Sequence, residues 1–123
     1  MKALLRKLHA PVYERRQRAL LRLIGGCLTS GESLLDIGCG SGTLSGALAR
    51  ECGLEARGLE THPRKQCVIP VDPYDGETIP HEDDSFDNVL LADVLHHEEQ
   101  PLRLLEEACR VAAKRVIVKD HKT

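Results

Sequence analysis

The stretch SLLDIGCGSGTLSGALA, Ser33 to Ala49, decides the fold, because its character changes halfway along. It opens on an apolar run, Leu34 to Ile37, that predicts a short buried strand. Three glycines follow at every second position: Gly38, Gly40 and Gly42. From Thr43 onward the apolar residues have helical spacing. A strand, a glycine turn and a helix in this order are typical of a site where the backbone approaches a ligand closely.

Strands and helices alternate along the rest of the chain. Periodicity and end signals predict three helices: Pro11–Leu28, Thr43–Cys52 and Pro101–Val111. Apolar runs predict five strands: Leu34–Ile37, Ala56–Glu60, Cys67–Val71, Asp87–Ala92 and Arg115–Lys119. Because the strands are apolar throughout, we expect an α/β fold with a mostly parallel sheet and helices on both faces.

The third predicted strand differs from the others in two ways. Pro70 lies inside it, which favours a place at the edge of the sheet. Few residues separate Glu60 from Cys67, although parallel neighbours usually need a dozen or so connecting residues. We therefore expect a single turn or an irregular crossover there.

Composition bounds the function. The chain has 123 residues, enough for one domain, which we divide into an N-terminal helical segment (1–30) and a nucleotide-binding core (31–123). Aromatic residues make up only 2%, which argues against stacking platforms for single-stranded nucleic acid. The basic stretch Lys2–Arg22 fits either an anionic partner or, as we prefer, the solvated face of an amphipathic helix.

Five scattered cysteines without a C-x-x-C pair indicate reduced thiols rather than a disulfide framework or a zinc site. No apolar run reaches membrane-spanning length, and the N-terminus lacks the apolar core of a secretory signal. These features predict a cytoplasmic protein with neither a nucleic-acid nor a membrane partner.

The spacing of the glycines separates two classes of ligand. The dinucleotide fingerprint is G-x-G-x-x-G, and its third position falls here on Thr43. The observed spacing is G-x-G-x-G preceded by Asp36, and an acid, Glu60, ends the second predicted strand. The segment YDGETIPHEDDSFDNVLLADVLHH, Tyr74 to His97, follows. Together these motifs resemble class I S-adenosylmethionine (SAM) methyltransferases of the small-molecule, type 11 branch, over Ser33 to His121.

The resemblance implies a Rossmann-like, doubly wound sheet and assigns the methionine and ribose ends of SAM. Asp36 would brace the turn and reach the SAM amino group. The backbone of Gly38, Cys39, Gly40 and Gly42 would lie under the methionine and ribose moieties. Glu60 would accept hydrogen bonds from both ribose hydroxyls, which suits an acceptor-only carboxylate. The alternatives are that Asp36 only caps the turn and that Glu60 only precedes a helix start.

For the adenine and the acceptor, the resemblance implies roles further along the chain. Asp75 would bind the exocyclic amine and the Gly76 N–H a ring nitrogen, although Asp72 competes for the role and the pair also fits an ordinary turn. Ala92 and Asp93 would border the methyl group and the acceptor.

The implied reaction is displacement of the sulfonium methyl group by an acceptor atom, in which the protein mainly aligns the partners and excludes water. His96 or His97 is the predicted base where the acceptor is protonated. The same pair beside two glutamates could instead suggest a metal, but we expect none. A nicotinamide-dependent oxidoreductase is disfavoured by the residue at the third fingerprint position.

Two departures from the family pattern matter. His81 stands where the family usually has Phe, which predicts a less apolar adenine side. The sequence as given ends just after the fifth strand, whereas the family fold continues with two more strands. We therefore expect Arg115–Lys119 to form an apolar sheet edge that favours self-association. The alternative function is a catalytically inactive domain that binds SAM or a partner.

Overall fold

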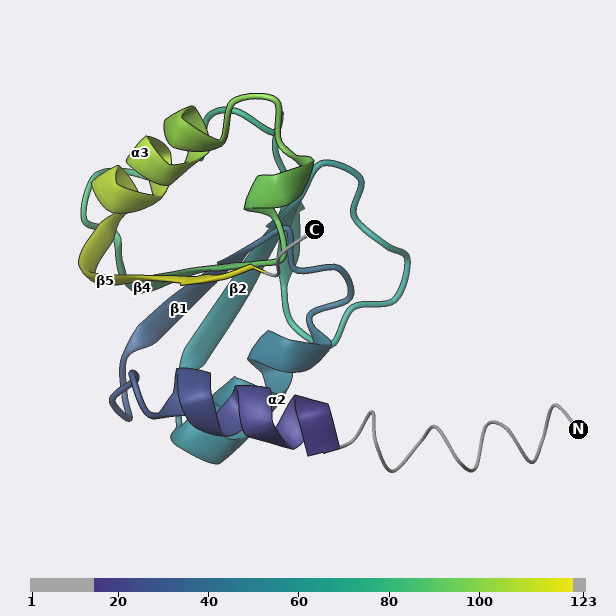
Figure 1. Cartoon of the computed structure of the whole chain (residues 1–123), viewed down its shortest axis with the longest axis vertical. Helices are drawn as coiled ribbons and strands as arrows, with labels where there is room; N and C mark the ends of the chain where they lie inside the picture. Colours follow the sequence, from purple (N-terminus) through teal and green to yellow (C-terminus); the bar gives the residue numbers. More distant parts are fainter. Residues whose placement is uncertain (1–14, 121–123) are drawn as a thin grey trace, which may run out of the picture.

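Five strands form a single parallel sheet in the computed structural model, which describes residues 15–120 (Figure 1). The strands are β1 (Ser33–Ile37), β2 (Glu55–Glu60), β3 (Val71–Pro73), β4 (Phe86–Ala92) and β5 (Ala112–Lys119). Their order in the sheet is β3-β2-β1-β4-β5. β1 lies in the centre and pairs with β2 on one side and β4 on the other, so the strand order reverses at its carboxyl end. In parallel sheets a ligand crevice forms at such a point.

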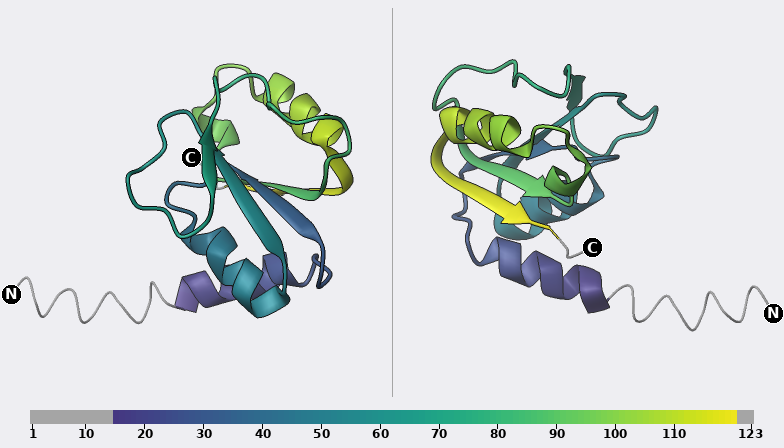
Figure 2. Two further views of the ribbon diagram at one scale, coloured as in Figure 1. Left: turned by 180° about the vertical axis from the view of Figure 1, so that it is seen from behind. Right: turned by 45° about the horizontal axis from the view of Figure 1, so that its top comes forward.

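Helices cover both faces of the sheet, as the sequence predicted (Figures 1 and 2). Helix α3 (Pro101–Val111) and the short 3₁₀ helix η1 (Leu95–His97) cover one face. Helix α2 (Thr43–Cys52) and a helix described over residues 15–25 cover the other. The predicted bounds of α2 and α3 are confirmed. The predicted helix Pro11–Leu28 is confirmed over residues 15–25, and residues 11–14 lie outside the described residues. It ends at Gly25 rather than at Leu28, at the first of two consecutive glycines.

Successive residues of the central strands supply two separate cores. Leu35 and Ile37 of β1 and Val89 of β4 belong to the core beneath α3, and all are fully buried. Leu34 and Leu90 face the other way and pack with residues of α2 and of the helix 15–25. This two-sided burial explains why the strands read as continuous apolar runs.

The position of the third strand was predicted incorrectly. The apolar run Cys67–Val71 is not a strand: the ladder with β2 begins only at Val71, paired with Gly58. Residues 61–70 form the crossover, which contains no helix and runs back over the glycine turn. There the Val68 N–H donates to the Ser41 carbonyl at 2.9 Å. The predicted irregular crossover and the edge position of β3 are confirmed.

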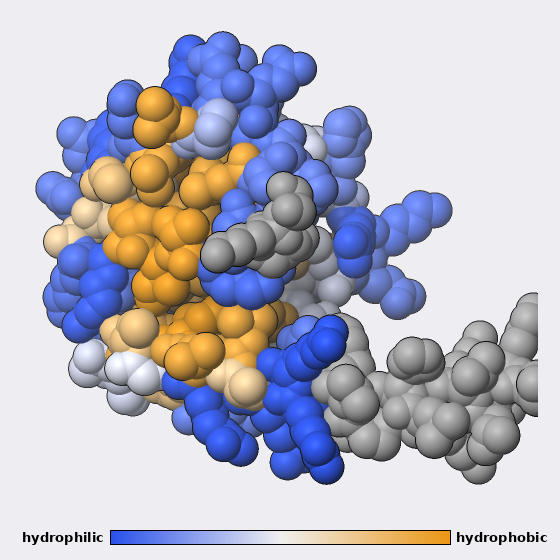
Figure 3. Space-filling model, in the orientation of Figure 1, coloured by the Kyte–Doolittle hydropathy of each residue, from blue (hydrophilic) through white to orange (hydrophobic). Residues whose placement is uncertain are grey.

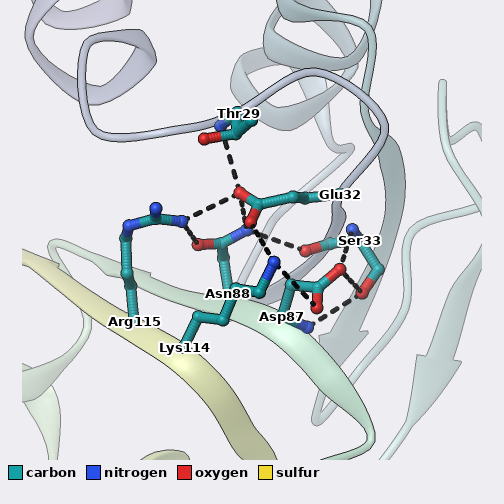
Figure 4. A network of polar contacts seen from close by, with 7 residues as sticks. All are labelled: Thr29, Glu32, Ser33, Asp87, Asn88, Lys114 and Arg115. Atoms are coloured by element: carbon teal, nitrogen blue, oxygen red, sulfur yellow. Dashed lines mark hydrogen bonds and ion pairs between the residues drawn. The ribbon is translucent and has the colours of Figure 1, made fainter.

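A polar network ties together the amino ends of three strands, at the opposite end of the sheet from the glycine turn (Figure 4). Glu32, which is 6% exposed, accepts hydrogen bonds from Lys114 Nζ and Arg115 Nη1, both at 2.8 Å. Its Oε1 also accepts from Asn88 Nδ2, a buried residue of β4, at 3.2 Å. The hydrogen bond from Lys114 is the main reason why the pKa of Glu32 falls to about 2. We infer a structural role, since the network joins β1, β4 and β5.

β5 is the last strand of the sheet on its side within the described residues. Figure 3 shows apolar side chains gathered on the face where this edge lies, between α3 and the helix 15–25. Val118 of β5 is 45% exposed and Leu23 of that helix 73%. No helix among residues 15–120 is long and apolar enough to cross a membrane.

Candidate functional site

Three cavities lie in a row along the carboxyl ends of the central strands. The largest, about 450 Å³, contains Asp36 and the glycine turn. It shares Gly38 and Asp93 with a middle cavity of about 200 Å³ that Glu60 lines. The middle cavity shares residues with a third of about 270 Å³ that Asp75 and Gly76 line. The row brings together most of the residues predicted to bind the cofactor.

The glycine turn and the end of β2 are joined by a hydrogen bond. The Gly40 N–H donates to Glu60 Oε1 at 2.7 Å, and the Gly38 N–H donates to the Leu59 carbonyl at 2.8 Å. The predicted neighbourhood of glycines and acid is therefore present. The Glu60 carboxylate lines the middle cavity while its Oε1 is held in place by the turn.

At Gly42 and Gly58, side chains from other parts of this chain occupy the space that a Cβ would need. A Cβ at Gly42, whose φ is 84°, would lie 2.5 Å from Cγ1 of Ile69 in the crossover. A Cβ at Gly58 of β2 would lie 2.3 Å from Cys39 Sγ. Gly42 does not line any of the three cavities. Packing against Ile69 explains a glycine at this position, and its contact with the cofactor stays a prediction.

Asp36 is a buried carboxyl group that faces the largest cavity. It is 3% exposed, and this desolvation raises its pKa to about 7, with the nearby Glu60 charge acting in the same direction. A hydrogen bond with Ser45 acts in the opposite direction. The group is thus poised to ionise near neutral pH, which a cationic ligand group would favour.

Cys39 lines the same cavity, and its thiol interacts electrostatically with the carboxyl groups of Asp36 and Glu60. Burial, followed by the charges of Asp36 and Glu60, raises the pKa of its thiol to about 12. It is a free thiol, as are the other four cysteines. A thiol with such a pKa is protonated at neutral pH and is a poor nucleophile.

At the far end of the row, Asp75 organises its own loop. Its Oδ1 accepts hydrogen bonds from the N–H groups of Thr78 and Glu77, both at 2.8 Å, and these lower its pKa. Asp75 and Gly76 line the third cavity, which fits the predicted adenine position as well as the alternative of an ordinary turn. His81 does not line that cavity: its ring packs edge-on against Phe86.

Asp93 stands where the largest and the middle cavity meet. Its φ is 58°, and its N–H donates to the Lys119 carbonyl at 2.6 Å. Lys119 Nζ in turn donates to both carboxylate oxygens, at 2.9 and 2.8 Å. The end of β5 therefore holds Asp93 by backbone and side chain together, next to Ala92 in the cavity wall.

The two predicted bases are in different surroundings although their rings lie 3.8 Å apart. His97 lines the middle and the third cavity. His96 instead pairs through Nδ1 with Asp120 Oδ1 and lines none of the three cavities. Among residues 15–120 no group of three or more His, Cys, Asp or Glu side chains could hold a metal ion.

Sequence reasoning missed several residues of the cavity walls, among them Tyr74, Thr61 and Arg64. Tyr74 lines the middle cavity, and burial, followed by the Glu98 and Glu60 charges, raises its pKa to about 12. Thr61 lines the middle and the third cavity, and Arg64 lines the largest. Tyr74 and Thr61 follow the ends of strands, a signal that could have identified them. Arg64 lies in the irregular crossover, where no sequence pattern predicts the direction of a side chain.

Comparisons with known proteins supply evidence that is independent of this geometry. Residues 18–120 match the model of the family described as methionine biosynthesis protein MetW. Norajmaline N-methyltransferase of Rauvolfia serpentina is 27% identical over 95 residues, which cover 67% of this chain and 32% of that protein.

Two solved structures have the same fold. A SAM-dependent methyltransferase of Aquifex aeolicus aligns with a TM-score of 0.62 and 22% identity, over 78% of this chain and 57% of that one. The [4+2]-cyclase SpnF aligns with a TM-score of 0.68 and 24% identity, over 78% of this chain and 40% of that one. The aligned part of this chain spans about a third of the length of its curated relative, the N-methyltransferase. Because one of the similar structures is a cyclase, the fold alone does not determine the reaction.

Proposed function

Because the chain belongs to the methionine biosynthesis protein MetW family, we propose that it binds S-adenosyl-L-methionine and transfers the sulfonium methyl group to a small-molecule acceptor. The product would be S-adenosyl-L-homocysteine. The observation that carries the proposal is the row of cavities at the carboxyl ends of β1, β2 and β4, with the Glu60 carboxylate hydrogen-bonded to the Gly40 N–H. The N-methyltransferase relative supports a small-molecule acceptor.

In this proposal the cofactor lies along the whole row. Asp36 accepts a hydrogen bond from its ammonium group, and the Gly38–Gly42 backbone supports the methionine and ribose. Glu60 accepts from the ribose hydroxyls in the middle cavity. Asp75 and Gly76 receive the adenine in the third. The sulfonium supplies an already activated methyl group, so the chain's own residues bind, orient and exclude water.

The methyl group is transferred near Asp93 and Ala92, where the largest and middle cavities meet. Of the two histidines, His97 lies within the row and is the better placed to take a proton from an acceptor bound there. The other, His96, pairs with Asp120 and lines none of the three cavities.

We further propose a cytoplasmic location, which five free thiols support. The exposed edge of β5 supports self-association by strand pairing. Neither nucleic acid nor a membrane is part of the proposed activity.

Calorimetric titration with S-adenosylhomocysteine, SAM and NAD tests the cofactor. We expect binding of the first two and little response to NAD. Transfer of label from methyl-tritiated SAM to a panel of small amines, carboxylic acids, phenols and thiols then tests the reaction. Tight binding of NAD without any response to S-adenosylhomocysteine would overturn the proposal, whereas binding without transfer to any acceptor would favour an inactive SAM-binding domain.

A further inference from the structure

The largest of the three cavities in the row contains a cation that the proposed function has not used. Arg64, in the crossover between β2 and β3, lines this cavity together with Asp36 and the glycine turn. Its guanidinium lies over Gly40: Cζ and Nη2 are both 3.4 Å from the position of a Cβ on that glycine. The guanidinium is therefore placed against the backbone where the methionine end of the cofactor is proposed to lie.

Arg64 also differs from most arginines of the sheet and its connections. Arg57, Arg103, Arg110 and Arg115 each form an ion pair with an acidic side chain. Arg50 of α2 has no ion pair among the described residues, but it does not line this cavity. Within residues 15–120 the Arg64 guanidinium has neither an ion-pair partner nor a side-chain hydrogen bond. It is also the single cationic side chain among the described residues that line this cavity.

The charges of the cavity complement one kind of ligand group. Asp36 on one wall suits an ammonium, and Arg64 on another suits a carboxylate, which a planar guanidinium binds through two parallel hydrogen bonds. The second acid, Asp93, is already neutralised by Lys119 at 2.8 Å and does not compete for the guanidinium. An acid and a base facing one cavity match the zwitterion of an α-amino acid.

We infer that Arg64 is the residue that binds the α-carboxylate of the methionine moiety of SAM. The inference rests on the proposed function and assigns this chain's own side chain to a group that the glycine turn and Glu60 leave without a partner. The cofactor is the source of the carboxylate because the cavity continues through Gly38 and Asp93 into the one that holds Glu60. One molecule can therefore span both.

The test uses two ligands that differ only in this carboxylate, SAM and decarboxylated SAM. We expect the wild-type chain to bind SAM at least about tenfold more tightly, because a charge-assisted pair is lost in the analogue. Arg64→Gln should bind the two equally, through a loss of SAM affinity alone. Arg64→Lys keeps the charge but not the fork and should retain part of the preference. Lys65→Gln, at an exposed neighbour that does not line the cavity, is the matched control and should behave like the wild type.

Arg64 is exposed, so Arg64→Gln should keep the wild-type melting temperature. A variant that still prefers SAM by the wild-type factor, or one that loses affinity for both ligands equally, would overturn the role of Arg64 and leave the proposed function in place. Failure of the wild-type chain to bind either ligand would overturn the proposed function itself, and this inference with it.

Discussion

Gly40 and Glu60 are joined by a hydrogen bond of 2.7 Å from the backbone N–H of the glycine to Oε1 of the carboxylate. The bond couples the turn after β1 to the end of β2, so the two sides of the proposed ribose position are fixed relative to each other. A carboxylate is the better acceptor for this N–H, but a neutral amide oxygen of the same shape can also accept it. A substitution of Glu60 by glutamine can therefore separate the effect on stability from the effect on ligand binding.

Glu60→Gln should weaken binding of S-adenosylhomocysteine by at least about tenfold, because charge-assisted bonds to the ribose hydroxyls are lost. The melting temperature should change little, since the amide oxygen replaces Oε1. Calorimetry and thermal unfolding measure the two effects. Glu55→Gln, at the exposed start of the same strand, is the control. Unchanged affinity in Glu60→Gln would show that the ribose lies elsewhere.

The contact between Cys39 and Gly58 predicts a coupled pair. Gly58→Ala should destabilise the fold by roughly 1–3 kcal/mol, because its Cβ would meet the cysteine sulfur. Adding Cys39→Ala removes the sulfur and should restore part of the loss. Urea unfolding of the two single variants and the double variant measures the coupling. Additive effects would mean that the sulfur moves aside without cost.

The buried Asp36 predicts a stability that falls with rising pH. The folded, ligand-free chain holds this proton with a pKa of about 7, far above the usual 3.8, so folding favours the protonated group. The free energy of unfolding should therefore fall from about pH 4 to about pH 7 and then level off. Three pKa units correspond to about 4 kcal/mol at most. Asp36→Asn should remove this fall, as urea unfolding at several pH values would reveal; parallel curves for both proteins would contradict the prediction.

Glu32 predicts the opposite change at lower pH: a free energy of unfolding that rises with rising pH. Its pKa is lowered to about 2, chiefly by Lys114, so the unfolded chain binds the proton more readily. Its stabilising contribution is present above about pH 4.5 and is lost as the pH falls towards 2. Glu32→Gln should lower the melting temperature at pH 7 and have little effect near pH 2. Glu106→Gln, at an exposed residue of α3, should match the wild type at both. Equal destabilisation by Glu32→Gln at both pH values would instead indicate loss of packing.

Val118 tests self-association through the sheet edge. Because β5 is the last strand on its side of the sheet within residues 15–120 and the Val118 side chain is exposed, sedimentation velocity should show association that increases with concentration. Val118→Lys should shift the protein towards the monomer. Leu23 is also an exposed apolar residue but lies on the helix 15–25, so Leu23→Lys should not have this effect. A monomer at every concentration, or equal effects of the two variants, would exclude strand pairing at this edge.

Much of the fold could be predicted because local signals and tertiary packing agree. Helix α2 is capped by Gly53, whose φ is 69°, and α3 has Pro101 at its first position, so α2 ends and α3 begins where their sequences indicate. The third strand could not be located in this way. The apolar run Cys67–Val71 mostly covers the glycine turn, with Ile69 against Gly42. The residues that pair with β2 are Val71–Pro73, at and after the end of that run.

The same distinction applies to the site. Glu60 was predicted beside the glycines because both follow the carboxyl ends of neighbouring strands. Arg64 was not, because its direction depends on the path of an irregular segment over the turn. The separation of His96 from His97 likewise depends on one turn of 3₁₀ helix, a detail that spacing does not fix.

The crossover of residues 61–70 has a consequence for how this chain can vary. In a longer βαβ unit, the connecting helix lies away from the ligand, so insertions there leave the site unchanged. Here the same ten residues connect two strands, fill the space above Gly42 through Ile69 and line the largest cavity through Arg64. Lengthening the connection would displace both side chains together. Sequence drift in this segment is therefore coupled to the shape of that cavity, and grafting a longer, helical crossover into it would alter the cavity as well as the connection.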